Sequence, residues 1–591
     1  MHMETPSPAQ GLSKGYSLLH RGALRAALGL LCVLATGCGL CERVEEDRDA
    51  AKSAASFATL IPADADLAVF AGDLKAVRDG LASADRSLGA QFPIKAALAE
   101  VERAIGVDPT NAEAMRSKGV QSERGLAVVR TDEQATLLMA VENQELFSKH
   151  LNNTAQQRWG GAAKPIDKKI GDHQIQLLVK KSAIDPQQQK PPMLTASNVI
   201  FAWTFVGKVA VVTPGKELVG NTKDPEIILG QVLATTEATS LSKQPDYVTL
   251  TKTIGSAYPI YAIYNFPGAL ERQAKRTPGE EEAKALRETA GRFARLGLGL
   301  KVTDERAQLR ALMLMQPDTL KQFTQTTQAM GDFKLHGALS DKNPLLLKVA
   351  VNPTLVLDQF AQTLNADERA SMESSLNSLK ESRGLDVRGA LLPALDGNVL
   401  VSVEDITQKG MTELAVNGFS MALLQEMNAV VAFGVKDRAA IVKALDQAKD
   451  ASLGLMSRAE ENNVLRYALR APGSDDDAPP LATLVVGDTQ LVLLTTKVDL
   501  KKGMALARLE SQAKPMPLTL APADKLLSER SWSGLVVDTG EIEAKLGSSP
   551  LTGRVGPVLS PFQAWLLTSH TVPEGQIIEL NLVFKPKTEG Q

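Results

Sequence analysis

The apolar positions of this chain follow two patterns, one typical of strands and the other of amphipathic helices. The apolar run Leu137–Val141 predicts a strand, and helical spacing follows it in Gln144–Leu151. Asn143 lies between them and is a residue type that caps helices. The apolar run Val430–Val435 and the polar Asp437 repeat this succession. Both segments therefore predict a strand, a capping turn and a helix.

The same order of patterns occurs in both halves of residues 58–591, at a spacing of about 270–295 residues. Gly106-Val107-Asp108 has a counterpart in Gly384-Leu385-Asp386. The corresponding predicted elements are the strands Gly125–Val129 and Gly397–Val401, the helices Gln144–Leu151 and Arg438–Ala448, the strands Gly207–Thr213 and Gly487–Thr495, the strands Ile260–Asn265 and Gly534–Asp538, the helices from Gly268 and from Glu541, and the strand pairs Leu296–Val302 with Gln308–Met315 and Ala564–His570 with Gln576–Phe584. Their shared order favours an internal duplication, although α+β proteins also reuse strand–helix units without one.

Short polar turns between alternating strands favour antiparallel sheets with helices packed on one face. We therefore expect an α+β protein of two tandem, duplicated units, at residues 58–330 and 331–591. Charged helices are expected over Asn365–Arg383 and Glu280–Arg295, with Glu280 and Lys284 able to pair at i,i+4.

The N-terminus carries the pattern of a secretory signal. Lys14, Arg21 and Arg25 precede a short apolar run over Ala26–Ala35. That run is about half the length that a membrane-spanning helix needs. We expect residues 1–37 to be a signal peptide.

Leu34-Ala35-Thr36-Gly37-Cys38 follows this run and resembles the lipobox of bacterial lipoproteins. The resemblance implies that Leu34 to Gly37 are recognised by the signal peptidase and that the Cys38 thiol is acylated. Ala35 stands where leucine is most usual in the family. Gly39 after the cysteine, rather than aspartate, favours the outer membrane by resemblance to sorting in many diderm bacteria. Residues 38–57 then form the lipidated cysteine and a charged, alanine- and serine-rich tether.

Cys38-Gly39-Leu40-Cys41 also has the spacing of a redox motif. A redox motif follows a strand and opens a helix, whereas this one closes a signal-like run. The 550 residues after Cys41 contain no cysteine, so the body holds no disulfide.

The body resembles an uncharacterised bacterial domain family found behind signal peptides or membrane anchors. The resemblance rests on Leu60-Ile61-Pro62-Ala63-Asp64, on the Gly-x-Asp segment and on the strand–turn–helix unit. It covers most of residues 58–591 and implies an extracytoplasmic location. No active site is known for this family, so the resemblance transfers no residues.

Composition narrows the classes of function. The net charge of -3 provides no basic field for nucleic acid, and aromatic residues make up only 4% of the chain. Trp159, Trp203, Trp532 and Trp565 are scattered singly and are expected in the core or partly buried.

Candidate chemistry is sparse, and we expect no cofactor and no metal. The histidines after Cys38, which are His150, His173, His336 and His570, lie far apart in the sequence. Asp475-Asp476-Asp477 lacks the spacing of a calcium loop. Gly11-Leu12-Ser13-Lys14-Gly15 has the spacing of a nucleophile elbow, but it lies before the expected cleavage site. Gly215-Lys216 is not a Walker A loop, because Glu217 follows it rather than Ser or Thr, and Gly297 and Gly299 alternate within a strand pattern and do not make a phosphate loop. We expect Pro186–Pro192 to be a loop.

These observations favour a membrane-tethered, non-enzymatic envelope lipoprotein that acts as a scaffold or interaction module of unknown molecular activity, with the membrane and an envelope protein as its expected partners. The alternative is a carrier of lipid or another apolar ligand, because curved antiparallel sheets can enclose an apolar cavity. An enzyme assembled from distant loops is the third possibility.

Overall fold

The structure is a computed structural model of the 591-residue chain. It describes residues 55–88, 106–108, 111–132, 134–159, 163–180, 198–216, 221, 223–255, 258–327, 344–364, 366–407, 409–410, 426–452, 454–470, 473, 479–495, 498–508, 531–546 and 560–585. Within these ranges, no helix has the length and apolar character needed to cross a membrane.

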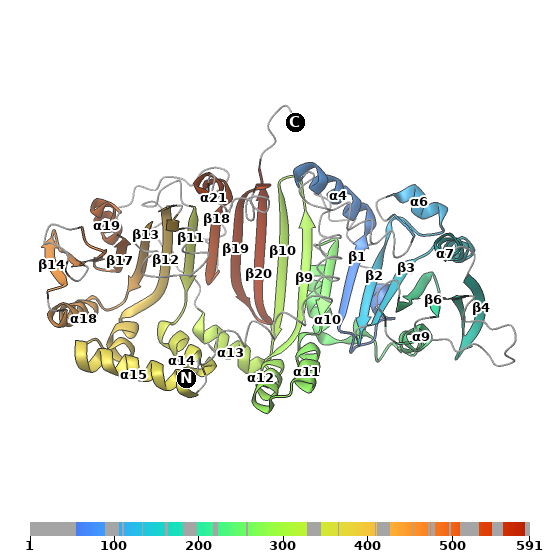
Figure 1. Ribbon diagram of the computed structural model, residues 1–591, viewed down its shortest axis with the longest axis horizontal. Helices are drawn as coiled ribbons and strands as arrows, with labels where there is room; N and C mark the ends of the chain where they lie inside the picture. Colours follow the sequence, from blue (N-terminus) through green and yellow to red (C-terminus); the bar gives the residue numbers. More distant parts are fainter. Residues whose placement is uncertain are drawn as a thin grey trace, which may run out of the picture. The chain divides into compact units, whose positions relative to one another are not determined.

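The chain folds into two compact units, one up to Gln316 and the other from Pro317. Each unit combines helices with a sheet of antiparallel strands, so the α+β class expected from the sequence is confirmed (Figure 1).

Unit 1 contains a sheet of ten described strands in the order β4-β5-β6-β7-β3-β2-β1-β8-β9-β10. Its strands are β1 (Leu67–Asp73), β2 (Arg124–Thr131), β3 (Gln134–Ala140), β4 (Ala163–Ile170), β5 (His173–Lys180), β6 (Val199–Val206), β7 (Val209–Pro214), β8 (Ile260–Tyr264), β9 (Phe293–Val302) and β10 (Arg306–Met315). Its helices are α4 (Leu74–Leu88), α6 (Ala112–Ser117), α7 (Gln144–Trp159), α9 (Pro225–Leu233), η3 (Leu241–Lys243), α10 (Pro245–Leu250), η4 (Thr251–Gly255), α11 (Phe266–Arg276) and α12 (Glu280–Ala290).

Unit 2 also contains ten described strands, in the order β14-β15-β16-β17-β13-β12-β11-β18-β19-β20. Its strands are β11 (Leu345–Ala350), β12 (Leu395–Ile406), β13 (Met427–Val435), β14 (Met456–Glu461), β15 (Val464–Leu469), β16 (Ala482–Val486), β17 (Gln490–Thr495), β18 (Ser533–Asp538), β19 (Phe562–Val572) and β20 (Gly575–Phe584). Its helices are α13 (Pro317–Thr326), α14 (Pro353–Thr363), α15 (Ala366–Arg383), η6 (Val387–Leu391), η7 (Leu392–Ala394), α18 (Arg438–Ala451), α19 (Leu500–Ala507) and α21 (Thr539–Leu546).

The two capping turns expected from the sequence are confirmed. The Asn143 side chain accepts the N–H of Leu146 at 3.0 Å, at the start of α7. The Asp437 side chain accepts the N–H of Ala440 at 3.0 Å, at the start of α18. Each cap binds one of the free N–H groups of a first helical turn, which places a helix directly after a central strand.

Gly297 and Gly299 lie within strand β9, as expected. A Cβ atom at Gly297 would meet Leu250 and Ile254, and one at Gly299 would meet Ile254 and Tyr258. These glycines therefore let α10 and η4 pack closely on the sheet.

Two local expectations were wrong. The helix expected over Glu280–Arg295 ends at Ala290, because the chain from Phe293 pairs with β8 and β10 as strand β9. The charged pair formed on α12 is Lys284 with Glu288, at 3.8 Å, rather than Glu280 with Lys284.

Helices cover both faces of the unit 2 sheet, and the expectation of helices on one face only was also wrong. Ile441 and Leu445 of α18 pack with Leu491 of β17. Met504 and Leu506 of α19 pack with Val492 and Leu494 of the same strand, on the opposite face. The reason is that β17 is apolar at nearly every position, so both of its faces require cover.

Candidate functional site

A continuous row of apolar side chains crosses the sheet of unit 2. Directly paired residues in antiparallel strands point to the same face. Following these pairs from β17 to β20 gives Leu493, Val431, Val401, Leu347, Leu535, Leu567 and Leu580, which we call the central row.

All seven side chains of the central row are only half-buried. The neighbouring row on the reverse face is Leu494, Val430, Ser402, Leu346, Val536, Leu566 and Asn581, and each of these residues is at most 3% exposed. One face of this sheet is therefore a closed core, whereas the other keeps apolar surface in contact with solvent.

Packed clusters lie on either side of the central row. Towards one end of the strands, Phe433 and Leu491 pack with Ile441 of α18 and with Ala394 of η7. Towards the other end, Val403, Met427 and Ala429 form a small cluster with Leu345. The central row is the strip between these two clusters.

The row of paired residues continues beyond Leu493 through Leu484 to Tyr467, where it meets polar groups. The Tyr467 hydroxyl donates to Asp446 Oδ1 at 2.8 Å, and Arg458 donates to the same carboxylate at 2.9 Å. Burial, followed by the hydrogen bond to Asp446, raises the pKa of Tyr467 above its usual range. The phenol therefore stays neutral and closes the strip beside α18.

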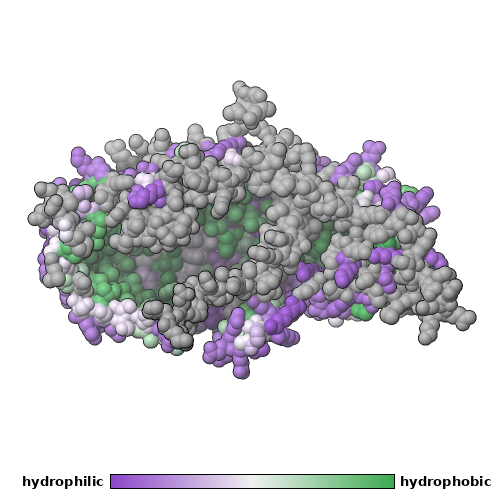
Figure 2. Space-filling model, in the orientation of Figure 1, coloured by the Kyte–Doolittle hydropathy of each residue, from purple (hydrophilic) through white to green (hydrophobic). Residues whose placement is uncertain are grey.

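Figure 2 shows hydrophobic side chains in a hollow over the strands of unit 2, bordered by hydrophilic residues. Neighbouring strands lie about 4.8 Å apart, so a row over seven strands is roughly 29 Å long. One leaflet of a bilayer core is about 15 Å thick, which is the length that a lipid acyl chain spans. The central row is long enough to hold such a chain lengthwise.

The corresponding row in unit 1 is more closed. It consists of Val212, Leu137, Val128, Val69, Ala262, Leu298 and Ala311. Val69, Val212 and Ala262 are each 1% exposed, and Leu137 is 7% exposed. Two of the seven residues are alanines, so this row also offers less apolar surface.

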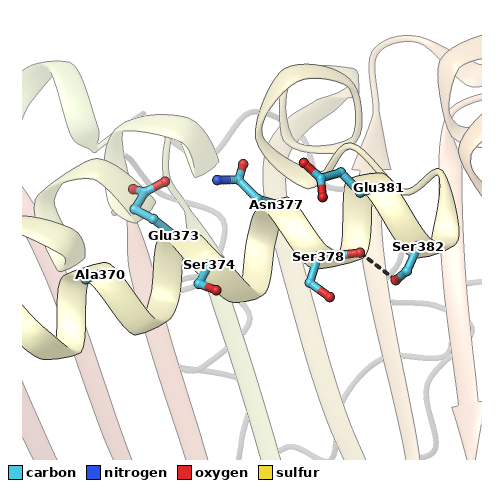
Figure 3. A pocket seen from close by; sticks show the side chains of 7 residues that line it. All are labelled: Ala370, Glu373, Ser374, Asn377, Ser378, Glu381 and Ser382. Atoms are coloured by element: carbon cyan, nitrogen blue, oxygen red, sulfur yellow. Dashed lines mark hydrogen bonds between the residues drawn. The ribbon is translucent and has the colours of Figure 1, made fainter.

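A second hollow in unit 2, of about 490 Å³, lies along α15. It is lined by one polar stripe of this helix: Ala370, Glu373, Ser374, Asn377, Ser378, Glu381 and Ser382 (Figure 3). Glu373 accepts two bonds from Arg388, at 2.9 and 3.0 Å, and Ser382 donates to the carbonyl of Ser378. These groups bind their own neighbours and do not form a nucleophile–base pair.

The site residues predicted from the sequence lie largely outside the part of the chain that the structure describes. Cys38 and the residues of its recognition motif, Leu34, Ala35, Thr36 and Gly37, lie outside the described residues, as do Gly11–Gly15, Pro186–Pro192, His336 and Asp475–Asp477. His150 lies on α7, His173 on β5 and His570 on β19. Within the described ranges, no three His, Cys, Asp or Glu side chains are close enough to hold a metal ion.

Three of the four tryptophans have side chains within the described part of the chain, one in unit 1 and two in unit 2. Trp203 is fully buried, whereas Trp532 and Trp565 are half-buried, as expected. Trp565 pairs with Val537 and with Leu582, so it lies on the same face as the central row. Its indole is therefore a natural probe of this face.

Sequence reasoning missed the central row. The available signal was the presence of apolar residues at consecutive positions, as in Leu345-Leu346-Leu347, which predicts a strand with two apolar faces. That pattern does not show which face lacks cover.

No family model and no curated protein matches this chain. Two solved structures of TP0453 were found. Crystal form I is 8% identical, covers 44% of this chain and 78% of its own, and has a TM-score of 0.23. Crystal form III is 7% identical, covers 46% of this chain and 86% of its own, and also has a TM-score of 0.23. At this TM-score the similarity supports no conclusion about the fold or function of this chain.

Proposed function

We propose that unit 2 binds the acyl chain of a lipid along the central row, within a lipid-anchored protein of the bacterial envelope. The observation that carries this proposal is the half-burial of seven paired apolar side chains on a sheet whose reverse face is closed. A contiguous row of apolar side chains that stays partly in contact with solvent is typical of a binding site. It favours an apolar ligand over a purely scaffolding role.

The energetics are adequate for a carrier. Burying one methylene group contributes about 0.8 kcal/mol, so half-covering a chain of about 16 carbons contributes roughly 6 kcal/mol. The loss of ligand freedom on binding offsets part of this gain. A ligand that binds moderately and can be released is what a carrier requires.

Native mass spectrometry of the mature sequence from Gly39 to Gln591, exported without its acyl anchor, tests this proposal. We expect a bound mass that organic solvent releases as lipid. A clean apo mass, even after incubation with phospholipid, would overturn the carrier proposal and favour a scaffold, for which crosslinking would identify the protein partner.

We further propose that residues 1–37 direct export and that Cys38 is acylated, which anchors the chain to the outer membrane. The signal-like run and the lipobox resemblance of Leu34–Cys38 support this address. Stable anchoring takes about two acyl chains.

Replacing Cys38 with alanine should move the protein from the membrane fraction to the soluble fraction, or leave an uncleaved precursor. Removal of the only thiol at the cleavage site blocks acylation. Cys41→Ala is the matched control and should leave the protein on the membrane. Normal processing and membrane attachment of the Cys38 variant would contradict the lipobox.

We also propose that the two units arose by duplication. Each strand of unit 1 has a counterpart ten strands later, and the order within the two sheets is the same. The register supports the same view, because the row through Val69 of β1 and the row through Leu347 of β11 each cross ten strands in direct pairing. Gly125 and Gly397 lie against backbone carbonyls of Ala71 and Val351, next to these central strands.

A further inference from the structure

Unit 1 contains a hollow that joins apolar walls to two cations. It has a volume of about 390 Å³ and lies where the described chain begins. Its lining includes Ser56, Phe57, Arg124, Ala140 and Lys208. The floor is fixed, because Phe57 is 1% and Ala140 5% exposed.

The two cations come from a strand and a turn that lie at the same end of the central strands. Arg124 begins β2, and Lys208 lies in the turn between β6 and β7. Strand β3 lies between them, and its continuation at Val141 donates its N–H to the carbonyl of Lys208. This backbone bond fixes the turn that carries Lys208 beside the hollow.

Neither cation pairs with a carboxylate among the residues that the structure describes. Asp73 lies opposite Arg124 in the sheet, but its carboxylate accepts the N–H groups of Lys75 and Ala76 at 2.8 and 3.0 Å. Glu123, the neighbour of Arg124 in sequence, is bound by Arg116. The residues that line the hollow therefore include two cations and no carboxylate.

We infer that this hollow binds the phosphate group of an anionic phospholipid headgroup, and that unit 1 thereby docks on the membrane surface. Two cations beside an apolar floor match a phosphodiester attached to glycerol and acyl groups. Ser56, which lines the hollow, follows Cys38 by 18 residues in the sequence, so the proposed anchor keeps the hollow near lipid. The inference rests on the proposed envelope address and not on the ligand of unit 2.

The test is flotation of the mature sequence from Gly39 to Gln591 with vesicles of phosphatidylcholine alone or mixed equally with phosphatidylglycerol. We expect binding to the anionic vesicles only, weakening as salt rises. Each basic residue near an anionic surface contributes about a fivefold gain in binding, so Arg124→Gln with Lys208→Gln should weaken binding about 25-fold. Both residues are exposed, so the double variant should keep its fold.

The matched control is Lys164→Gln with Lys169→Gln on β4, which makes the same change in net charge at exposed positions of unit 1. It should leave binding within about twofold of the parent, since these cations lie away from the hollow. An equal loss of vesicle binding in both double variants would show that binding depends only on the total charge of the protein, and it would overturn the proposed site. The absence of any preference for anionic vesicles would overturn it as well.

Soluble glycerol phosphate distinguishes a lipid surface from a free phosphate ester. When glycerol phosphate is titrated into the same protein, isothermal calorimetry should show no measurable binding. Saturable binding of glycerol phosphate that the Gln double variant abolishes, without vesicle binding, would assign the hollow to a soluble ligand and overturn membrane docking. Because the acyl anchor is absent and native mass spectrometry reports the unit 2 ligand separately, failure here is distinguishable from failure of the proposed function.

Discussion

Replacing Leu535 and Leu567 together with glutamine should weaken binding of a lipid or a fluorescent fatty acid by roughly 30- to 150-fold. The two residues pair directly on β18 and β19, and Leu535 also pairs with Leu347 at the middle of the central row. Each contributes about 1–1.5 kcal/mol of apolar contact that an amide side chain cannot provide. Glutamine is one bond longer than leucine and can place its amide in solvent from these half-buried positions, so the main change at the row is in polarity.

The matched control is Leu298→Gln in unit 1. Leu298 corresponds to Leu567 in strand order and is also half-buried. It should leave ligand binding unchanged, because the unit 1 row is largely closed by its neighbours. Displacement of the fluorescent fatty acid gives the affinity, and a thermal melt checks folding. Unchanged affinity in the folded Leu535/Leu567 variant would place the ligand elsewhere.

Leu346→Ala and Leu347→Ala should differ sharply in their effect on the stability of unit 2, although the residues are neighbours. Leu346 is 1% exposed and belongs to the large cluster that includes Leu400, Val430 and Val536. Its truncation leaves a cavity and should lower the free energy of unfolding by about 2–5 kcal/mol. Leu347 is half-buried on the opposite face, so its truncation should cost about 1 kcal/mol.

Hydrogen exchange of backbone amides in β11 and its neighbours β12 and β18 measures this difference locally, which matters because a chain of two units need not unfold in one step. Leu347→Ala should weaken lipid binding while unit 2 stays folded. Leu346→Ala should weaken lipid binding only under conditions in which it unfolds unit 2. Equal loss of protection in both variants would mean that the central row is ordinary core, and it would contradict the proposed site.

Local sequence patterns predicted many elements of this fold well. The strand–turn–helix units at Leu137–Leu151 and Val430–Ala448 were confirmed, because strand alternation and helix capping are determined within a few residues. The failure over Glu280–Arg295 has the opposite cause. Arg292 to Arg295 continue a helical pattern, but Phe293 pairs with Met315 of β10, and the chain from Leu296 pairs with β8, about 30 residues earlier.

The sequence by itself determined the α+β class, the capped helices and the presence of apolar residues on both faces of strands such as β11. Only the tertiary structure decided which of those faces is core and which is open. Leu346 and Leu347 are the same residue type in the same strand, yet Leu346 packs among strands and a helix that follow it by up to about 220 residues. Burial depends on these distant neighbours, and the local pattern of apolar residues does not specify which of them cover a given face.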